Sequence, residues 1–387
     1  MNSSIELRRW LHAHPELSER EQQTAARIAE RLNETAPARL LEGLGSMQSG
    51  LCAVYHGKEP GPAVLIRCEL DALPIAESNR FEHRSKTPGV SHKCGHDGHM
   101  ATLVRLAELL SAAPPPRGRV LLLFQPAEET GTGACAVLDD PRFQELGAPD
   151  FVYAFHNVPR FELGTVLIRR GVFAQASVGF AVRFEGSTSH SSYPEHGRSP
   201  ARAVTKLVEA VSDVKSLLQG EPAAPVLGTV TFAQLGEAGE GSNFGVAPGT
   251  GLVMGVLRSQ YTPDLDELRL GLEAQAKALA EASDLHHSLS WHEPFAATHS
   301  EDGCVERVAA AAFDLGLKVE EVAEPFRWSE DFGHFTERYT GAFFGLGSGS
   351  AQPQLHDDAY DYPDELIETG ARLYRAIIDQ HLGAAND

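Results

Sequence analysis

The chain lacks any apolar run long enough to cross a membrane. A membrane-spanning helix needs roughly 18 or more consecutive apolar residues, and no run in the 387 residues approaches that length. The first 30 residues are rich in Arg and Glu and contain no apolar segment of the kind found in signal peptides. From these two absences we expect a cytoplasmic location and no membrane partner.

Basic residues are also scarce. The chain has 33 Lys and Arg against 53 Asp and Glu, which gives a formal net charge of −20. Such a surface repels phosphate backbones and offers no basic patch for them, so we expect no nucleic-acid partner. An anionic small-molecule substrate would need a local cationic pocket.

Cysteine is sparse, with only five residues, an odd number. They are widely spaced and mostly in apolar surroundings, which is unlike a disulfide framework. Apart from Cys94, we expect them to be small core residues. These four are Cys52, Cys68, Cys135 and Cys304.

The length exceeds that of a single hydrophobic core, so two domains are expected. Near-continuous apolar runs at 51–55, 63–67, 120–124 and 151–155 alternate with helical patterns and predict an α/β sheet covered on both faces. Residues 176–291 change to a β-α-β-β-α-β order, the ferredoxin-like motif. The sequence therefore predicts a catalytic domain of residues 1–175 and 292–387, interrupted by a smaller domain of residues 176–291.

Metal-binding side chains follow several of the predicted strands. Cys94 and His96 precede a helix predicted from Gly98, Glu128-Glu129 follows the strand at 120–124, and His156 follows the strand at 151–155. Ligands collect at the carboxyl ends of strands in open α/β sheets. Thiolate, imidazole and carboxylate are ligands of Zn²⁺ and its first-row neighbours. In extended backbone Cys94 and His96 would face the same side.

Two metal ions need about four to six protein ligands and a bridging water. His356 is the late histidine that could complete the set, although alone it could equally be a solvent-exposed loop residue. Adjacent glutamates in extended backbone point in opposite directions, so one of Glu128 and Glu129 can bind metal while the other acts as general base. The matching reaction is amide hydrolysis.

Six motifs occur in order along the chain. They are Asp71-Ala72-Leu73-Pro74, Cys94 to His99, Gln125 to Glu129, His156, Ser329 to Phe332, and Leu355-His356. Their order and spacing resemble those of the M20 metallopeptidases. The similarity is to the branch of amidohydrolases that act on N-acyl amino acids, including hippurate hydrolases and auxin-conjugate hydrolases, and it covers nearly the whole chain.

The resemblance implies a zinc-peptidase-like catalytic domain and a lid domain that also dimerises, giving a homodimer or homotetramer. It implies two divalent metal ions per subunit, Zn or Mn, with Co or Ni also open. Glu128 matches the catalytic base, Asp71 a supporting carboxylate, and His190 a lid histidine that stabilises the oxyanion. The metal ligands implied by the match are Cys94, His96, Glu129, His156 and His356.

Some positions depart from the family pattern, and the resemblance places them in the region that determines substrate specificity. Glu69 stands where relatives commonly have Asp, and the segment Asn243 to Pro248 is about two residues longer than usual. Asn243 and Arg258 are the candidates for binding the substrate, with Arg258 placed to hold an α-carboxylate. The acyl group and the amino acid stay open.

Other functions explain fewer of these residues. A thiol hydrolase with Cys94 as nucleophile leaves Glu128, His156 and His356 without a role. A serine hydrolase lacks its Gly-x-Ser-x-Gly motif. A metal-binding protein without catalysis would have lost Glu128 or a ligand. Within the favoured class the alternative is a metallo-dipeptidase or carboxypeptidase, but those branches carry His-x-Asp where this chain has Glu69-Leu70-Asp71.

Overall fold

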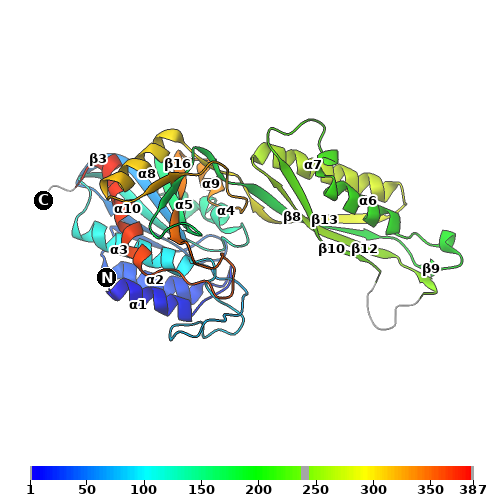
Figure 1. Cartoon of the computed structure of the whole chain (residues 1–387), viewed down its shortest axis with the longest axis horizontal. Helices are drawn as coiled ribbons and strands as arrows, with labels where there is room; N and C mark the ends of the chain where they lie inside the picture. Colours follow the sequence, from blue (N-terminus) through cyan, green and yellow to red (C-terminus); the bar gives the residue numbers. More distant parts are fainter. Residues whose placement is uncertain (1, 237–243, 385–387) are drawn as a thin grey trace. The chain divides into compact units, whose positions relative to one another are not determined.

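The computed structural model describes residues 2–236 and 244–384. These residues form two compact units (Figure 1). The first unit is built from Met1–Phe173, Thr298–Phe326 and Asp331–Asp387, and the second from Ala174–Ala297 and Arg327–Glu330. The chain thus leaves the first unit after Phe173 and returns to it, so the second unit is an insertion.

The first unit contains an eight-stranded mixed sheet, with strand order β1-β2-β4-β3-β5-β16-β6-β15. Its centre is parallel, since β3 pairs in parallel with both β4 and β5, and β5 with β16. Every residue from Val120 to Phe124 in β4 is buried, as expected for a strand covered on both faces. The strands of this sheet are β1 (Arg39–Leu44), β2 (Gly50–His56), β3 (Glu59–Glu69), β4 (Arg117–Gln125), β5 (Phe151–Pro159), β6 (Val166–Ile168), β15 (Val319–Glu321) and β16 (Gly341–Gly349). Two further strands, β7 (Gly171–Ala174) and β14 (Thr298–Ser300), form a separate two-stranded sheet.

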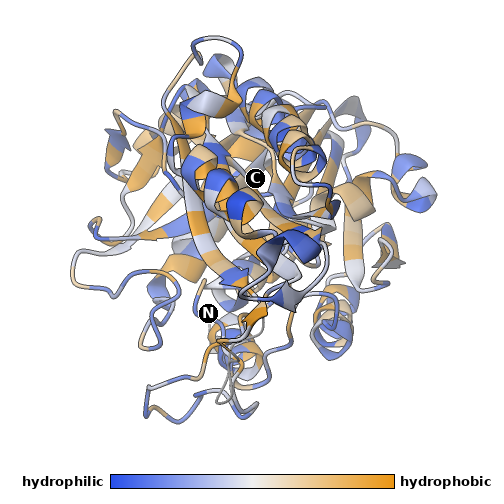
Figure 2. Cartoon of the chain, turned by 90° about the vertical axis from the view of Figure 1, so that its right-hand side faces the viewer, coloured by the Kyte–Doolittle hydropathy of each residue, from blue (hydrophilic) through white to orange (hydrophobic). Residues whose placement is uncertain are grey.

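Helix α3 is the central helix of this unit and packs against α1, α10 and β3. Its residues Met100, Leu103, Val104 and Leu110 are fully or almost fully buried. In Figure 2 the helices carry alternating hydrophilic and hydrophobic colours, as expected when one side of a helix faces the core. The helices are α1 (Asn2–Ala13), α2 (Gln22–Glu34), α3 (His96–Ala112), α4 (Gly133–Leu138), α5 (Pro141–Gln144), α8 (Asp302–Asp314), α9 (Gly333–Thr336) and α10 (Glu365–Leu382).

The second unit follows the order β8-α6-β10-β12-α7-β13, as the sequence predicted. Its antiparallel sheet has the strand order β10-β12-β8-β13. Along β12 alternate residues such as Val253 and Leu257 are buried, because α6 and α7 pack against the sheet. The elements are β8 (Ala176–Glu185), β9 (Ser189–His190), η1 (Pro194–His196), α6 (Ala201–Ser212), η2 (Val214–Leu217), β10 (Val226–Leu235), β11 (Val246–Ala247), β12 (Thr250–Ser259), α7 (Thr262–Glu281) and β13 (His286–Phe295).

The last strand of the second unit is longer than the sequence pattern suggested. β13 continues to Phe295 across an irregularity in its pairing with β8 after His292, so residues 292–297 belong to the second unit. The apolar alternation that marks the strand ends near Trp291, which is why the sequence placed the boundary there. Among the described residues no helix has the length and apolar character that a bilayer crossing requires.

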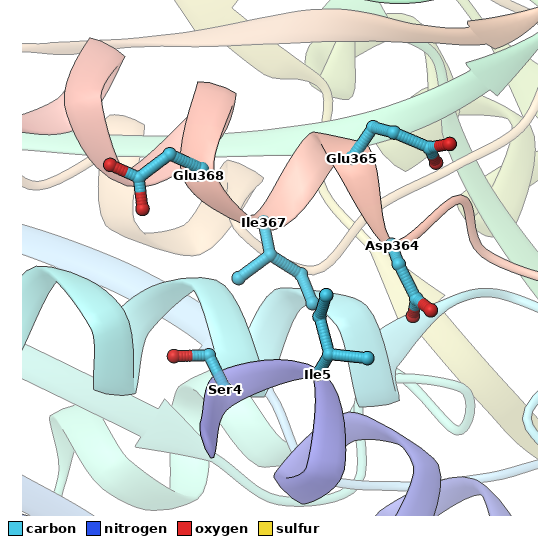
Figure 3. Close-up of a pocket in the computed structure, with 6 residues that line it drawn as sticks. All are labelled: Ser4, Ile5, Asp364, Glu365, Ile367 and Glu368. Carbon is cyan, nitrogen blue, oxygen red and sulfur yellow. The ribbon is translucent and has the colours of Figure 1, made fainter. Parts of the chain in front are cut away.

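A pocket of about 300 Å³ lies between α1 and α10. Figure 3 shows Ser4 and Ile5 on one side, and Asp364 and Ile367 on the other. Its lining contains none of the residues that the sequence nominated for metal binding or catalysis, so the candidate site lies elsewhere in the unit.

Candidate metal centre

Cys94 and His96 lie at the start of α3, joined by a glycine in a left-handed conformation. Gly95 has φ of +96°, and a Cβ there would lie 2.6 Å from Oδ1 of Asn157. The expectation of extended backbone was therefore wrong, and α3 begins at His96 instead of Gly98. The tight turn at Gly95, instead of a strand pleat, brings the Cys94 thiol and the His96 imidazole together.

Glu128 and Glu129 lie in a turn after β4. Ala127 has φ of +50°, and the N–H of Gly131 donates to the carbonyl of Glu128 at 2.7 Å. The expectation that the two glutamates alternate along extended backbone was thus also wrong. Oε2 of Glu128 and Oε1 of Glu129 each lie 4.0 Å from Nε2 of His96, so the turn directs both carboxylates toward the same imidazole.

Cys94, His96 and His156 form one candidate ligand group, with their ligand atoms within 4.8 Å of one another. Sγ of Cys94 lies 3.3 Å from Nε2 of His156. Nδ1 of His156 lies 2.9 Å from the carbonyl oxygen of Asn157, which holds Nε2 toward the thiol. His156 is within β5 and not after it, because the strand continues to Pro159.

Cys94, Glu129 and His356 form a second group that shares the Cys94 thiol with the first. Nε2 of His356 lies 3.6 Å from Oε2 of Glu129, and its side chain is 51% exposed. His356 has φ of +67°, and its N–H donates to the carbonyl of Lys93 at 2.9 Å. A thiolate shared by two ligand groups is an arrangement that can bridge two metal ions.

The donor atoms fit a divalent metal. Nε2 of His96 and Oε1 of Glu129 are both buried without a hydrogen-bond partner, which is costly unless another group satisfies them. These two atoms lie 4.0 Å apart. Because a metal–ligand distance is roughly 2.0–2.2 Å, one metal ion between them can reach both. Sulfur, nitrogen and carboxylate oxygen together suit Zn²⁺ and its first-row neighbours.

The electrostatics of the site call for a cation. Burial, reinforced by Glu129 and Glu128, holds the pKa of the Cys94 thiol well above its usual range. Burial raises the pKa of Glu129 to about 7. Burial lowers the pKa of His96, but the hydrogen bond with Asp71 and the charge of Glu69 together raise it to about 10. A metal ion would supply the positive charge that this concentration of acidic groups requires.

Asp71 supports the cluster through hydrogen bonds. Its fully buried carboxylate accepts from the N–H of Glu129 at 2.9 Å and from Ser18 at 2.8 Å. Its carbonyl oxygen lies 2.9 Å from Nδ1 of His96. Because Nδ1 is held there, Nε2 of His96 faces the other ligands, and Asp71 orients the imidazole.

The side chains that support the candidate ligands from behind were not identified from the sequence. Nδ1 of His99 lies 2.6 Å from Oε2 of Glu69, and Nε2 accepts from the N–H of Asn157 at 3.4 Å. Both ring nitrogens have partners, so His99 supports the site, and with Glu69 and His96 it forms a further group whose ligand atoms lie within 4.8 Å of one another. Arg67 forms ion pairs with both Glu69 and Asp331. The i, i+3 spacing of His96 and His99 was the signal available for this role.

The remaining residues that the sequence predicted for catalysis or substrate binding belong to the second unit. His190 is exposed in the short strand β9, and its Nδ1 accepts from the N–H of Ser192 at 3.1 Å. Arg258 is half-buried at the end of β12 and donates to the carbonyl of Arg327 at 3.1 Å and to Ser329 at 3.0 Å. Asn243 lies outside the described residues.

An α/β sheet with a thiolate, imidazole and carboxylate cluster beside its central strands is the architecture of a metal-dependent hydrolase. Residues 65–380 match peptidase family M20/M25/M40, and the chain belongs to this family. The resemblance drawn from the motifs is therefore confirmed, as are the α/β fold class and the prediction of a metal-dependent amidohydrolase.

Individual relatives cover nearly the whole chain. It is 32% identical to the N-acetyl-L-cysteine deacetylase of Bacillus subtilis (strain 168) over 94% of this chain and 84% of that protein. It is 27% identical to the hippurate hydrolase of Campylobacter jejuni over 97% and 96% of the two chains. A crystal structure of the Bacillus subtilis YXEP protein, described as a dinuclear metal-binding peptidase of the M20 family, has a TM-score of 0.78 at 25% identity, covering 97% and 96% of the two chains.

Proposed function

We propose that the protein hydrolyses the amide bond of N-acyl amino acids with two divalent metal ions, Zn²⁺ or Mn²⁺, with Co²⁺ or Ni²⁺ as alternatives. The observation that carries this proposal is the pair of ligand groups that share the Cys94 thiol. Glu128 beside them is buried and is the general base. The proposed ligands are Cys94, His96, Glu129, His156 and His356.

Bound metal ions would supply Lewis acidity, which acidifies a water molecule and polarises the substrate carbonyl. Glu128 accepts a proton from the attacking water as the new C–O bond forms, and delivers it to the leaving nitrogen as the C–N bond breaks. The products are a carboxylic acid and the free amino acid. Asp71 keeps Nε2 of His96 in place during this proton transfer.

The second unit contributes substrate recognition in this proposal. Arg258 binds the α-carboxylate, Asn243 contacts the substrate, and His190 donates to the developing oxyanion. The half-buried position of Arg258 supports its role, because burial lowers its pKa and a substrate carboxylate would compensate its charge. We further propose that this unit forms the contact of a homodimer or homotetramer.

The proposed substrate class is supported by the relatives, which include an N-acetyl-L-cysteine deacetylase and a hippurate hydrolase. The test is metal analysis of the purified protein followed by kinetics on N-acetyl, N-benzoyl and longer acyl amino acids beside dipeptides. We expect kcat/KM for at least one acyl amino acid to exceed that for every dipeptide. Preference for dipeptides would replace the proposal with a metallo-dipeptidase or carboxypeptidase.

A further inference from the structure

Ala127, the residue before Glu128, has an unusual backbone conformation. Its φ of +50° lies in the left-handed region, which a residue with a Cβ rarely adopts. It is fully buried, so the protein itself must hold it there. Such a conformation persists only when the surrounding structure enforces it. The contacts of Ala127 therefore show what fixes the turn that carries Glu128 and Glu129.

The carbonyl and the N–H of Ala127 are held by different parts of the chain. Its carbonyl accepts from the N–H of Gly133 at 3.1 Å and from that of Thr132 at 3.3 Å, both a few residues further on. Its N–H donates to Oε1 of Glu21 at 2.8 Å, from a residue 106 positions earlier in the sequence. The turn after β4 is thus tied to the start of α2.

Glu21 is itself fixed in one position. Its side chain is fully buried, and Oε1 also accepts from the N–H of Glu19 at 2.9 Å. Oε2 accepts from the hydroxyl of Ser49 at 3.0 Å. The Glu21 carbonyl accepts from the N–H of Ala25 at 2.8 Å, in the first turn of α2. Burying a carboxylate has a cost that burying an apolar side chain does not have, so a glutamate at this position needs a reason that the packing of α2 does not supply.

A second buried carboxylate holds the other side of the same turn. Oδ2 of Asp71 accepts from the N–H of Glu129 at 2.9 Å. The N–H groups on either side of Glu128 are therefore both fixed by carboxylates, that of Glu21 before it and that of Asp71 after it. Between these two contacts the carboxylates of Glu128 and Glu129 reach to 4.0 Å from Nε2 of His96.

We propose that Glu21 is a positioning residue of the metal centre, which keeps Ala127 in the left-handed conformation and so directs Glu128 and Glu129 toward the other ligands. It acts through the backbone of the turn and not on the substrate. The inference rests on the proposed function, because Glu128 and Glu129 are the base and a metal ligand in that proposal.

The test is calorimetric titration of the metal-free protein with Zn²⁺, beside steady-state kinetics of the Zn²⁺-loaded enzyme. Glu21→Ala should lower the Zn²⁺ affinity and kcat by about tenfold each, because an unsupported Ala127 prefers other backbone conformations by about that factor. KM should change by less than about twofold, since Glu21 does not bind the substrate.

Two variants of matched size and charge serve as controls. Glu21→Gln keeps an oxygen that accepts from the N–H of Ala127, so it should stay within about threefold of the wild type in Zn²⁺ affinity and kcat. Burial, reinforced by the charge of Asp71, already raises the pKa of Glu21 to about 7, so a neutral side chain fits this position. Glu30→Ala removes an exposed glutamate from α2 and should behave as the wild type does.

A double-mutant cycle separates positioning from a merely structural role. Glycine adopts the left-handed conformation without the cost that Ala127 carries, so Glu21→Ala should lower Zn²⁺ affinity and kcat by less than about threefold in an Ala127→Gly background. Equal losses in the two backgrounds would overturn the proposal, because Glu21 would then support only α2 and the loop of Ser49. Unchanged Zn²⁺ affinity and kcat in Glu21→Ala would overturn it as well.

The unfolding midpoint of each metal-free variant reports whether its fold is intact. Should Glu21→Ala fail to fold, Glu21→Met takes its place in the cycle, because it fills a similar volume without accepting a hydrogen bond. The Zn²⁺ titration decides the inference even where no N-acyl amino acid is turned over, and in that case only the proposed substrate class fails. A wild type without affinity for Zn²⁺ would refute the proposed metal centre and the inference together.

Discussion

The N–H of His356 donates to the carbonyl of Lys93 at 2.9 Å, which ties the last proposed metal ligand to the residue before the first. The Lys93 side chain strengthens the same connection. Its buried ammonium donates to the carbonyl of Tyr360 at 2.8 Å and to Glu77 at 2.6 Å. The loops that carry Cys94 and His356 are thus joined through both the backbone and the side chain of Lys93.

Replacing Lys93 should therefore loosen the metal centre. Lys93→Met keeps the length of the side chain but leaves Glu77 with His12 as its remaining ion-pair partner, so the loss should stay below the about 3 to 5 kcal/mol that an unpaired buried charge costs. We expect weaker metal binding in calorimetric titration and a lower unfolding midpoint. Lys86→Met, at an exposed position of the same loop, should change neither, and equal metal affinity in Lys93→Met and wild type would refute the role.

Replacing Glu128 and replacing Glu129 should have different effects on metal content and on the rate of hydrolysis. Glu128→Gln removes the proton acceptor and should retain bound metal while lowering kcat by about two to four orders of magnitude. Glu129→Gln removes a ligand and should lose metal as well as rate. Metal content by plasma emission spectrometry and steady-state kinetics are the measurements. The same metal content in both variants would contradict this division of roles.

Metal removal should abolish hydrolysis reversibly. A chelator should inactivate the enzyme, and added Zn²⁺, Mn²⁺ or Co²⁺ should restore activity, because the carbonyl is no longer polarised without the metal. Bound metal should also protect Cys94 from alkylation, since a ligating thiolate is not free to react. Equal alkylation rates with and without metal would count against Cys94 as a ligand.

Arg258 and His190 should differ in the substrates they affect. Arg258→Ala should lower kcat/KM for N-acyl amino acids by roughly 2 to 4 kcal/mol of transition-state binding while sparing the corresponding amides or esters, which lack the carboxylate. His190→Ala should impair both kinds of substrate, because oxyanion stabilisation acts on the scissile carbonyl. Parallel losses for charged and neutral substrates in Arg258→Ala would show that the guanidinium supports only Arg327 and Ser329.

The free energy of unfolding should fall in acid because His381 is protonated more readily in the unfolded state. Burial, with a contribution from Arg307, lowers the pKa of this imidazole to about 4, and its Nε2 lies 2.8 Å from the hydroxyl of Tyr153. An unfolded histidine has a pKa of about 6.5. Between pH 6.5 and 4 the unfolded state therefore binds more protons, so the free energy of unfolding falls as pH falls.

The measurement is urea unfolding of metal-free protein at pH 7 and pH 4.5. From the higher to the lower pH the wild type should lose about 1 to 2 kcal/mol more than His381→Gln, which has no proton to gain at this position. An identical loss in the two proteins would show that His381 does not set the acid response.

The sequence alone determined which segments form the elements and which residue types carry the chemistry. The apolar run in β4 and the β-α-β-β-α-β order of the second unit could be predicted because side-chain periodicity reports local backbone geometry and burial. The proposed ligands could be named from the pattern together with the family resemblance, since Glu129 and His156 come after predicted strands and Cys94 and His96 come before a predicted helix.

Tertiary structure decided how those side chains meet. Position 95 needs a glycine because the backbone is left-handed there and because Asn157, far away in the sequence, approaches too closely for a Cβ. The pairing of His99 with Glu69 likewise depends on a helix and a strand that pack together only in the folded chain. Periodicity carries no information about such long-range contacts, because they are set by the packing of whole elements and the closure of the loops between them.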